Sequence, residues 1–281
     1  MALPTMITVE TLQETLNQSD VVVLDCRFYL TDHGKGYQEY LLGHIPGAIF
    51  VDLHTELAGK ESDTSGRHPL PSEQVLANSI QNWGIDTHTQ VIVYDDMGGA
   101  IAARAWWMLV QQGIEVYVLD GGFPAWTASA LSIETQEHKA VIAKEKIEVS
   151  YPWFISEENV AENLVTEQFQ LVDSRDNARF QGLNETMDPV AGHIPGALNR
   201  PFTDNLTDAG TMKSPLLLAK EWGALLGEIE IPIVYYCGSG VTACHNILAM
   251  NHAGLEAKHV YIGSWSQWAK RIQRSMSESN E

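Results

Sequence analysis

The sequence predicts an α/β fold, built as two tandem copies of one parallel-sheet domain. The chain alternates short β-branched runs with segments of helical spacing, which is typical of a parallel sheet flanked by helices. The same motifs also recur in the same order in both halves of the 281 residues. Two copies of one domain agree with the usual length of about 100–200 residues per domain.

The internal repeat consists of four motifs. The first half contains VVVLDCR, GHIPGA, QVIVYDD and LDGGFPAW, and the second contains FQLVDSR, GHIPGA, IPIVYYC and YIGSWSQW. Four motifs in one order at a nearly constant offset indicate a duplication. The stretch between the copies is polar and charged, as in a linker. We therefore expect an N-terminal domain at 1–135, a linker at 136–150 and a C-terminal domain at 151–281.

The apolar runs in each copy place the expected strands. They read VVVLD, VIVYD and VYVLD in the first copy, and LVDS, PIVYY and VYIG in the second. Short runs of this kind, bounded by turn residues, fit buried parallel strands. Functional sites in such sheets form at the carboxyl ends of strands, on the loop that enters the next helix. The end of PIVYYC is therefore the place where we expect a site.

The charge balance argues against several classes of partner. The 36 acidic and 17 basic residues give a net charge of −19, which disfavours nucleic acid and anionic membranes as partners. No apolar run reaches the roughly 18 residues of a membrane span. The start of the sequence has neither the basic residues nor the apolar stretch of a signal peptide. Three cysteines cannot form a disulfide framework, so we expect a cytoplasmic protein.

The strongest chemical signal is the segment CGSGVT, from Cys237 to Thr242. Its glycines let the loop curl with its amides inward, and these amides and the following helix start favour an anion. Such surroundings hold a sulfur as thiolate and point to a nucleophile. The alternative is a buried strand-end cysteine without chemistry, which is what we expect of Cys26 and Cys244. When the two halves are aligned, Asp96 stands at the position that corresponds to Cys237, so the first half has no nucleophile.

Together these motifs resemble the rhodanese superfamily. The paired GHIPGA motifs, the paired D-x-R motifs and CGSGVTA carry the resemblance, which covers about Val21 to Trp268. It is closest to the two-domain sulfurtransferases that use 3-mercaptopyruvate. The resemblance implies two rhodanese-like domains, each a parallel sheet flanked by helices. It also implies that sulfane sulfur passes from a small-molecule donor, through a Cys237 persulfide, to cyanide, a thiol or thioredoxin. No cofactor and no metal are expected.

The resemblance also assigns site residues. Arg179 stands where the family has a substrate-binding arginine, whose planar fork suits a carboxylate. Ser239 and His68 match residues that handle protons in the enzymes that use 3-mercaptopyruvate. The alternatives are a surface arginine and a surface loop histidine. The remaining loop residues are expected to bind the donor: Gly238, Gly240, Val241 and Thr242.

Two positions depart from the family. The acidic partner of the proton-handling histidine falls on His54 here. The loop after Arg179 reads QGLNETMDPVA and lacks the family's second substrate-binding arginine, with Asp188 near its place. Arg67 and Arg200 are candidate substitutes because both lie close to the motifs.

Three alternative functions follow from the same residues. Thiosulfate enzymes of the family usually carry cations in the cysteine loop. The uncharged Gly238 and Ser239 therefore favour 3-mercaptopyruvate as donor, whereas the missing arginine argues for thiosulfate. A cysteine-dependent phosphatase needs an arginine six positions after its cysteine, where this chain has Ala243. A non-catalytic binding module is disfavoured because Cys237 and its loop are intact.

Recurrence in the half without a nucleophile indicates a structural role. On that ground we expect strand-end ion pairs at Asp25–Arg27 and Asp173–Arg175, and structural histidines at positions 44 and 193.

Overall fold

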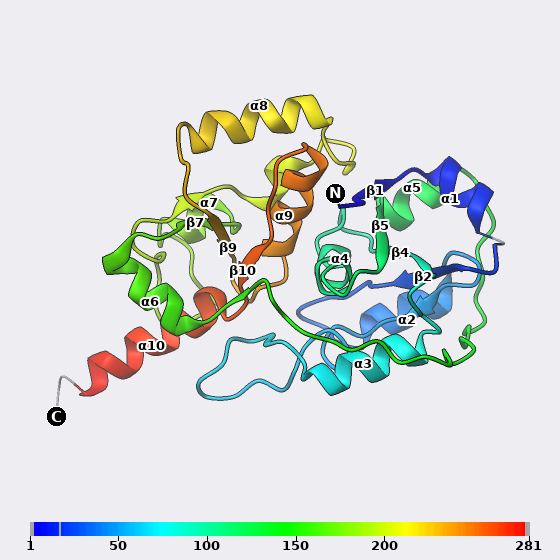
Figure 1. The fold of residues 1–281 in the computed structure, drawn as a ribbon, viewed down its shortest axis with the longest axis horizontal. Coiled ribbons are helices and arrows are strands. Elements are labelled where there is room, and N and C mark those ends of the chain that lie inside the picture. The colour runs from blue at the N-terminus through cyan, green and yellow to red at the C-terminus, as the bar shows by residue number, and fades with distance from the viewer. Residues whose placement is uncertain (1–2, 17, 279–281) are drawn as a thin grey trace. The chain divides into compact units, whose positions relative to one another are not determined.

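The computed structural model describes residues 3–16 and 18–278 of the chain. The chain forms two compact units, and Figure 1 labels most of their elements. Unit 1 contains Met1–Gly59, Pro71–Pro152 and Leu206–Lys213. Unit 2 contains Lys60–Leu70, Trp153–Asn205 and Ser214–Glu281. Each unit thus includes one short segment from the other half of the sequence.

Unit 1 is built on a five-stranded sheet. The strands are β1 (Met6–Ile7), β2 (Val21–Asp25), β3 (Ile49–Phe50), β4 (Gln90–Tyr94) and β5 (Glu115–Leu119). The helices are α1 (Val9–Thr15), α2 (Lys35–Leu42), α3 (Glu73–Asn82), α4 (Ala102–Val110) and α5 (Gly122–Ala128). Every residue of α4 is buried, which explains its nearly uniform apolar sequence AARAWWMLV.

Unit 2 repeats this plan. Its strands are β6 (Phe154–Ile155), β7 (Gln170–Asp173), β8 (Leu198–Asn199), β9 (Ile233–Tyr236) and β10 (His259–Tyr261). Its helices are α6 (Glu157–Thr166), α7 (Asn177–Phe180), α8 (Pro215–Leu226), α9 (Ala243–His252) and α10 (Ser264–Glu278), with a 3₁₀ turn, η1, at Phe202–Asn205.

The two sheets have equivalent strand orders, β1-β5-β4-β2-β3 and β6-β10-β9-β7-β8, and every strand pair is parallel. The predicted fold class, two parallel α/β domains in tandem, is confirmed. The sequence pattern predicted the longer central strands. It did not predict the two-residue strands β1, β3, β6 and β8, which are too short to show a periodicity.

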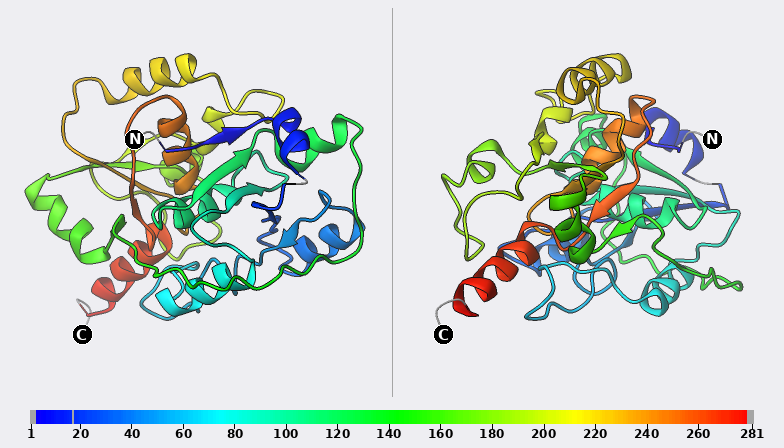
Figure 2. Two further views of the ribbon diagram at one scale, coloured as in Figure 1. Left: turned by 45° about the vertical axis from the view of Figure 1, so that its right-hand side comes forward. Right: turned by 60° about the vertical axis from the view of Figure 1, so that its left-hand side comes forward.

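Alternate side chains of β9 enter the two layers that cover the sheet of unit 2. Val234 and Tyr236 belong to a core cluster with Val160 of α6 and residues of α10. Tyr235 points the other way and meets Trp222 of α8 edge-on, with ring centroids 6.0 Å apart. Figure 2 shows α6 (green) beside α10 (red), and Arg271 of α10 pairs with Glu157 of α6. The sheet is therefore sandwiched between helices, with strand ends left for a site.

The D-x-R motifs form the expected ion pairs. Arg27 pairs with Asp25 at 2.6 Å, and Arg175 pairs with Asp173 at 2.7 Å. In each copy the arginine also donates to the carbonyl oxygen of the first glycine of GHIPGA, at 2.8 and 2.7 Å. The arginine thereby ties the end of a central strand to the turn that precedes the edge strand. This explains why both motifs recur in both halves.

The GHIPGA histidines also have structural contacts. The Nδ1 atoms of His44 and His193 lie 2.7 and 2.8 Å from the carbonyl oxygens of Tyr40 and Phe180. Each imidazole stacks on the ring of that same residue at 3.8 Å. No helix within the described ranges is both long and apolar enough to cross a bilayer.

Removing the charge of Asp25 should destabilise unit 1. Asp25→Asn leaves the Arg27 guanidinium, only 3% exposed, without its counter-charge. A buried cation left without its partner costs about 3–5 kcal/mol. We expect a loss of about 3 kcal/mol in the free energy of unfolding, measured by urea denaturation. Glu256→Gln, at an exposed pair with Lys258, should leave stability unchanged. Equal effects of the two variants would contradict a structural role for the buried pair.

Candidate active site

The strand order of unit 2 reverses at β7 and β9, whose carboxyl ends lie side by side. These strands are neighbours, but the chain leaves them in opposite directions, from β7 toward β8 and from β9 toward β10. Ligands of open parallel sheets bind at such a switch point. Cys237 directly follows β9, and Arg179 lies in α7 directly after β7. The topology therefore brings the predicted nucleophile and the predicted substrate arginine to one place.

The cysteine loop holds its sulfur in a fixed position. The Cys237 side chain is only 2% exposed. Its backbone N–H donates to Ser264 Oγ at 3.1 Å, and the Gly240 N–H donates to its Sγ at 3.2 Å. Gly240 has a φ of +76°, and a Cβ at this residue would lie 2.3 Å from the carbonyl oxygen of Ile262. Only glycine fits this turn, which aims an amide at the sulfur.

The loop of unit 1 after β4 is the structural twin of the cysteine loop. The Phe123 N–H donates to the Asp95 carbonyl oxygen at 2.9 Å, as the Trp265 N–H donates to that of Cys237 at 3.0 Å. Asp95 therefore occupies the place of Cys237. The sequence-based pairing with Asp96 was wrong by one residue, because the lengths between the repeated motifs differ and the offset drifts along the chain.

The twin loop shows what its shape binds. The fully buried carboxylate of Asp95 accepts four backbone N–H bonds of 2.7–2.9 Å, from residues 97, 99, 101 and 102. The positions equivalent to these four donors are residues 239, 241, 243 and 244 in unit 2, where the Cys244 N–H donates to the Val241 carbonyl oxygen at 3.1 Å and the Gly240 N–H is the amide that reaches Cys237 Sγ. The carboxylate oxygens lie one bond beyond Cγ, where the outer sulfur of a persulfide would lie beyond Sγ. This loop is thus a cradle for a small anion.

Two arginines approach the first loop residue, Gly238. A Cβ at Gly238 would lie 2.9 Å from Nη2 of Arg67 and 3.5 Å from Nη1 of Arg179. The Arg67 Nη1 donates to Asp188, and the Arg179 Nη2 donates to Asp188 at 3.2 Å and to Glu185 at 3.0 Å. The loop residues themselves carry no charged side chain. The positive charge beside the loop therefore comes from the two arginines, and the carboxylates of Asp188 and Glu185 offset it.

Both carboxylates are 2% exposed, yet their pKa values move in opposite directions. Burial raises the pKa of Asp188 above its usual value, against the attraction of Arg67. Burial alone would also raise the pKa of Glu185. Hydrogen bonds from the Met187 N–H and from Arg179 outweigh it and lower that pKa. Sequence reasoning missed these compensating carboxylates, although both lie in the loop that lacks the family's second arginine.

His68 meets Ser239 in unit 2. The His68 Nδ1 lies 2.9 Å from Ser239 Oγ, and the imidazole is 2% exposed. The segment Lys60–Leu70 brings it there, and Lys270 holds this segment by donating to Glu61 at 2.7 Å. A hydroxyl and an imidazole at this distance can exchange a proton.

The other sequence candidates are paired elsewhere, belong to unit 1 or are unreactive. Arg200 pairs with Glu221 at 2.6 Å and lies over the ring of Trp222, so it is not available as the second arginine of the loop. His54 lies in unit 1, where burial lowers its pKa. Burial raises the pKa of the Cys26 thiol well above its usual value, which keeps it protonated.

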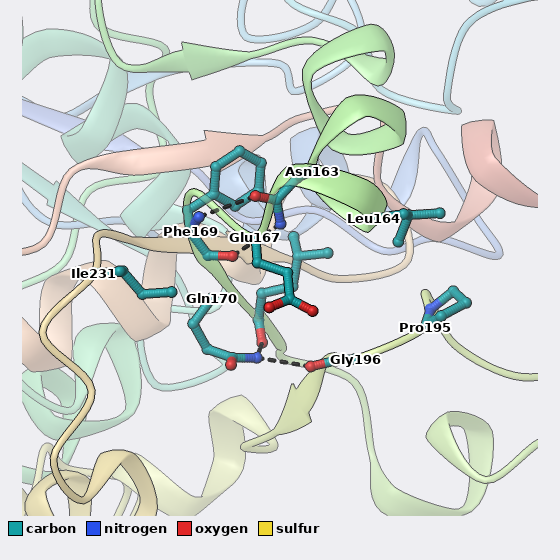
Figure 3. Close-up of a pocket in the computed structure, with 9 residues that line it drawn as sticks. Asn163, Leu164, Glu167, Phe169, Gln170, Pro195, Gly196 and Ile231 are labelled. Carbon is teal, nitrogen blue, oxygen red and sulfur yellow. Dashed lines mark hydrogen bonds between the residues drawn. The ribbon is translucent and has the colours of Figure 1, made fainter.

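A surface pocket at the opposite ends of β7 and β9 is not a competing site (Figure 3). Its volume is about 440 Å³, and Leu164, Phe169, Ile231 and others line it. The side-chain amides that line the pocket already donate to the backbone. Asn163 donates to the carbonyl oxygen of Phe169 and Gln170 donates to that of Gly196, each at 2.8 Å. None of the predicted site residues lines this pocket.

Comparisons with known proteins agree with the repeat. Residues 8–129 and 156–271 match the family of rhodanese-like domains. The chain is 42% identical over 276 residues to a Pseudomonas aeruginosa protein named "Probable 3-mercaptopyruvate sulfurtransferase", covering 97% of each. It is 36% identical over 255 residues to the thiosulfate sulfurtransferase of Mus musculus, covering 89% of this chain and 85% of that protein.

A solved structure is similar over nearly the whole chain. The 3-mercaptopyruvate sulfurtransferase from Leishmania major superposes with a TM-score of 0.85 at 27% sequence identity, covering 99% of this chain and 77% of that one. The resemblance seen in the sequence is thereby confirmed. With both halves matched to the same domain family, and with relatives of more than 30% identity along nearly its whole length, this chain belongs to the rhodanese family.

Proposed function

We propose that the protein is a sulfurtransferase that moves sulfur from 3-mercaptopyruvate to a thiophilic acceptor through a persulfide on Cys237. One observation carries the proposal. Cys237 stands in a loop whose twin in unit 1 holds a buried carboxylate on four backbone amides. A loop that binds an anion so well stabilises a thiolate before transfer and a persulfide after it.

The proposed first step transfers sulfur to the enzyme. The Cys237 thiolate attacks the donor sulfur, and the new S–S bond forms as the donor C–S bond breaks. The electron pair of that bond stays on the donor carbon as an enolate, which becomes pyruvate when it takes up a proton. His68 and Ser239, 2.9 Å apart, are placed to relay that proton. Arg179 and the loop residues 238 and 240–242 bind the donor.

The proposed second step regenerates the free Cys237 thiolate. A nucleophilic acceptor, such as cyanide, a small thiol or the thiolate of a thioredoxin, attacks the outer sulfur. The S–S bond breaks, and its electron pair returns to Cys237 as the thiolate. Because the loop amides hold charge at both stages, the enzyme needs no cofactor to store the sulfur between donor and acceptor.

The charge around Gly238 supports 3-mercaptopyruvate over thiosulfate. Arg67 and Arg179 bring two positive charges, and Glu185 and Asp188 bring two negative ones. A site with no excess positive charge favours a donor with one carboxylate over a dianion. A relative with 42% identity is named for 3-mercaptopyruvate, which supports the same donor, while mouse proteins named for 3-mercaptopyruvate and for thiosulfate are 34% and 36% identical to this chain.

Cys237 should be the only thiol that the reaction needs. Cys237→Ser should abolish thiocyanate formation from cyanide with either donor, because a serine hydroxyl cannot carry the sulfur. Intact mass spectrometry of the wild type, treated with donor alone, should show one added sulfur atom that cyanide removes.

The matched controls are Cys26→Ser and Cys244→Ser. Both thiols are buried, and their weak hydrogen bonds go to the carbonyl oxygens of Leu24 and Gly240, which a serine can also reach. Both variants should retain transfer activity. Substantial activity in Cys237→Ser, or no sulfur adduct on the wild type, would overturn the mechanism.

Removing one negative charge beside the loop should shift the donor preference. Asp188→Asn keeps an oxygen for Arg67 but leaves the cluster one positive charge in excess. The ratio of kcat/KM for thiosulfate to that for 3-mercaptopyruvate should rise about tenfold, since the dianion gains more from the added charge.

The control is Glu221→Gln, which changes a carboxylate paired with Arg200 in the same unit. It should leave the donor ratio as it is. A wild type that already prefers thiosulfate, or an Asp188→Asn ratio that stays constant, would show that charge at this cluster does not set the donor.

A further inference from the structure

The segment Lys60–Leu70 delivers a guanidinium to the cysteine loop at a fixed place. The Arg67 N–H donates to Ser266 Oγ at 3.1 Å. A Cβ on the neighbouring Gly66 would lie 2.4 Å from the carbonyl oxygen of Gly263, so the two backbones touch. The backbone that carries Arg67 is therefore packed against the rest of unit 2, which fixes the position of this residue.

The side chain of Arg67 is held by one nitrogen only. Its Nη1 donates to Asp188, which is 2% exposed and is itself fixed by its N–H bond to Glu185 at 3.1 Å. Its Nε is buried and has no hydrogen-bond partner among the described residues. Its Nη2 points at Gly238, since a Cβ there would lie 2.9 Å from it. No hydrogen bond among the described residues uses the edge formed by Nε and Nη2, and its Nη2 lies against the loop.

In Arg179, by contrast, the Nε–Nη2 edge of the guanidinium already has a hydrogen-bond partner. Its Nε and Nη2 both donate to Glu185, at 3.2 and 3.0 Å, so the edge that suits a carboxylate is already occupied. Only Nη1 remains on the side of Gly238. Between the two arginines, Arg67 therefore offers a complete fork to a ligand and Arg179 offers one nitrogen.

A buried guanidinium N–H without a partner, such as that of Nε, is costly, and a planar carboxylate can accept from Nε and Nη2 at once. We infer that Arg67 grips the carboxylate of the donor through its Nε–Nη2 edge, and that Asp188 is its positioning residue. The inference rests on the proposed function, because it assumes a donor with a carboxylate. Arg67 then takes the place of the arginine that is missing between Arg179 and the second GHIPGA, and Gly238 lacks a side chain because the fork occupies that space.

The test compares two donors and three variants. The donors are 3-mercaptopyruvate and mercaptoacetone, in which a methyl group replaces the carboxylate. Arg67→Ala should lower kcat/KM for 3-mercaptopyruvate roughly 30- to 100-fold, mainly through KM. The rate at which mercaptoacetone loads sulfur onto Cys237, followed by intact mass, should change less than about threefold, because this donor has no carboxylate to lose. Arg67→Lys keeps the charge without the fork and should lose about tenfold with 3-mercaptopyruvate.

The matched control is Lys270→Ala. Lys270 holds the same segment, through Glu61 and the carbonyl oxygen of Ser65, without touching the cysteine loop. It should leave both donors within about twofold of the wild type. If Arg67→Ala behaves like Lys270→Ala, or lowers both donors equally, Arg67 only fastens the segment and the inference is overturned. If the wild type does not take sulfur from 3-mercaptopyruvate, the proposed function fails instead, which is a separate result.

Discussion

The convergence of backbone amides on one point after the central strand is the interaction on which the rest of unit 2 depends. The turn requires a glycine at 240, a hydroxyl from Ser264 behind Cys237, and a helix, α9, that begins at Ala243. In unit 1 the same backbone encloses the carboxylate of Asp95 and binds it with four N–H bonds. In unit 2 the turn after β9 brings the Gly240 N–H within 3.2 Å of Cys237 Sγ. We propose that unit 2 keeps the sulfur of Cys237 for chemistry at the position that the Asp95 carboxylate fills in unit 1.

The second constraint is charge balance around that cradle. Arg67 and Arg179 reach Gly238 from two different segments, and Glu185 and Asp188 oppose them within hydrogen-bond distance. Glu185 also receives a hydrogen bond from Arg175, the arginine of the strand-end ion pair, at 3.4 Å. The residues that hold the sheet together thus also hold one of the arginines at the site. Donor choice in this account follows from the sum of charges and from which edges of the guanidinium forks are left open.

Much of the fold and part of the site could be predicted from the sequence, because they depend on local pattern. The repeat, the central strands and the glycine loop of Cys237 can each be recognised from a run of consecutive residues. The strand order then places Arg179 beside that loop. The choice between Arg67 and Arg200 could not be predicted, since it depends on contacts made far along the chain. Arg200 is held by Glu221, whereas Arg67 belongs to a segment that packs in unit 2. The sequence-based pairing of Cys237 with Asp96 was wrong by one residue because loop lengths differ between the copies.

The most direct test of the cradle is the stability of two isosteric variants, Cys237→Asp and Cys237→Asn, measured as free energies of unfolding in urea. If the amides around Cys237 are arranged as those around Asp95, the ionised carboxylate gains charge-assisted hydrogen bonds that the neutral amide side chain does not. We predict that Cys237→Asp is more stable than Cys237→Asn by about 1–3 kcal/mol at neutral pH. A Cys237→Asp variant that is less stable than Cys237→Asn would contradict it, because the loop would then repel the charge that the proposed chemistry requires it to hold.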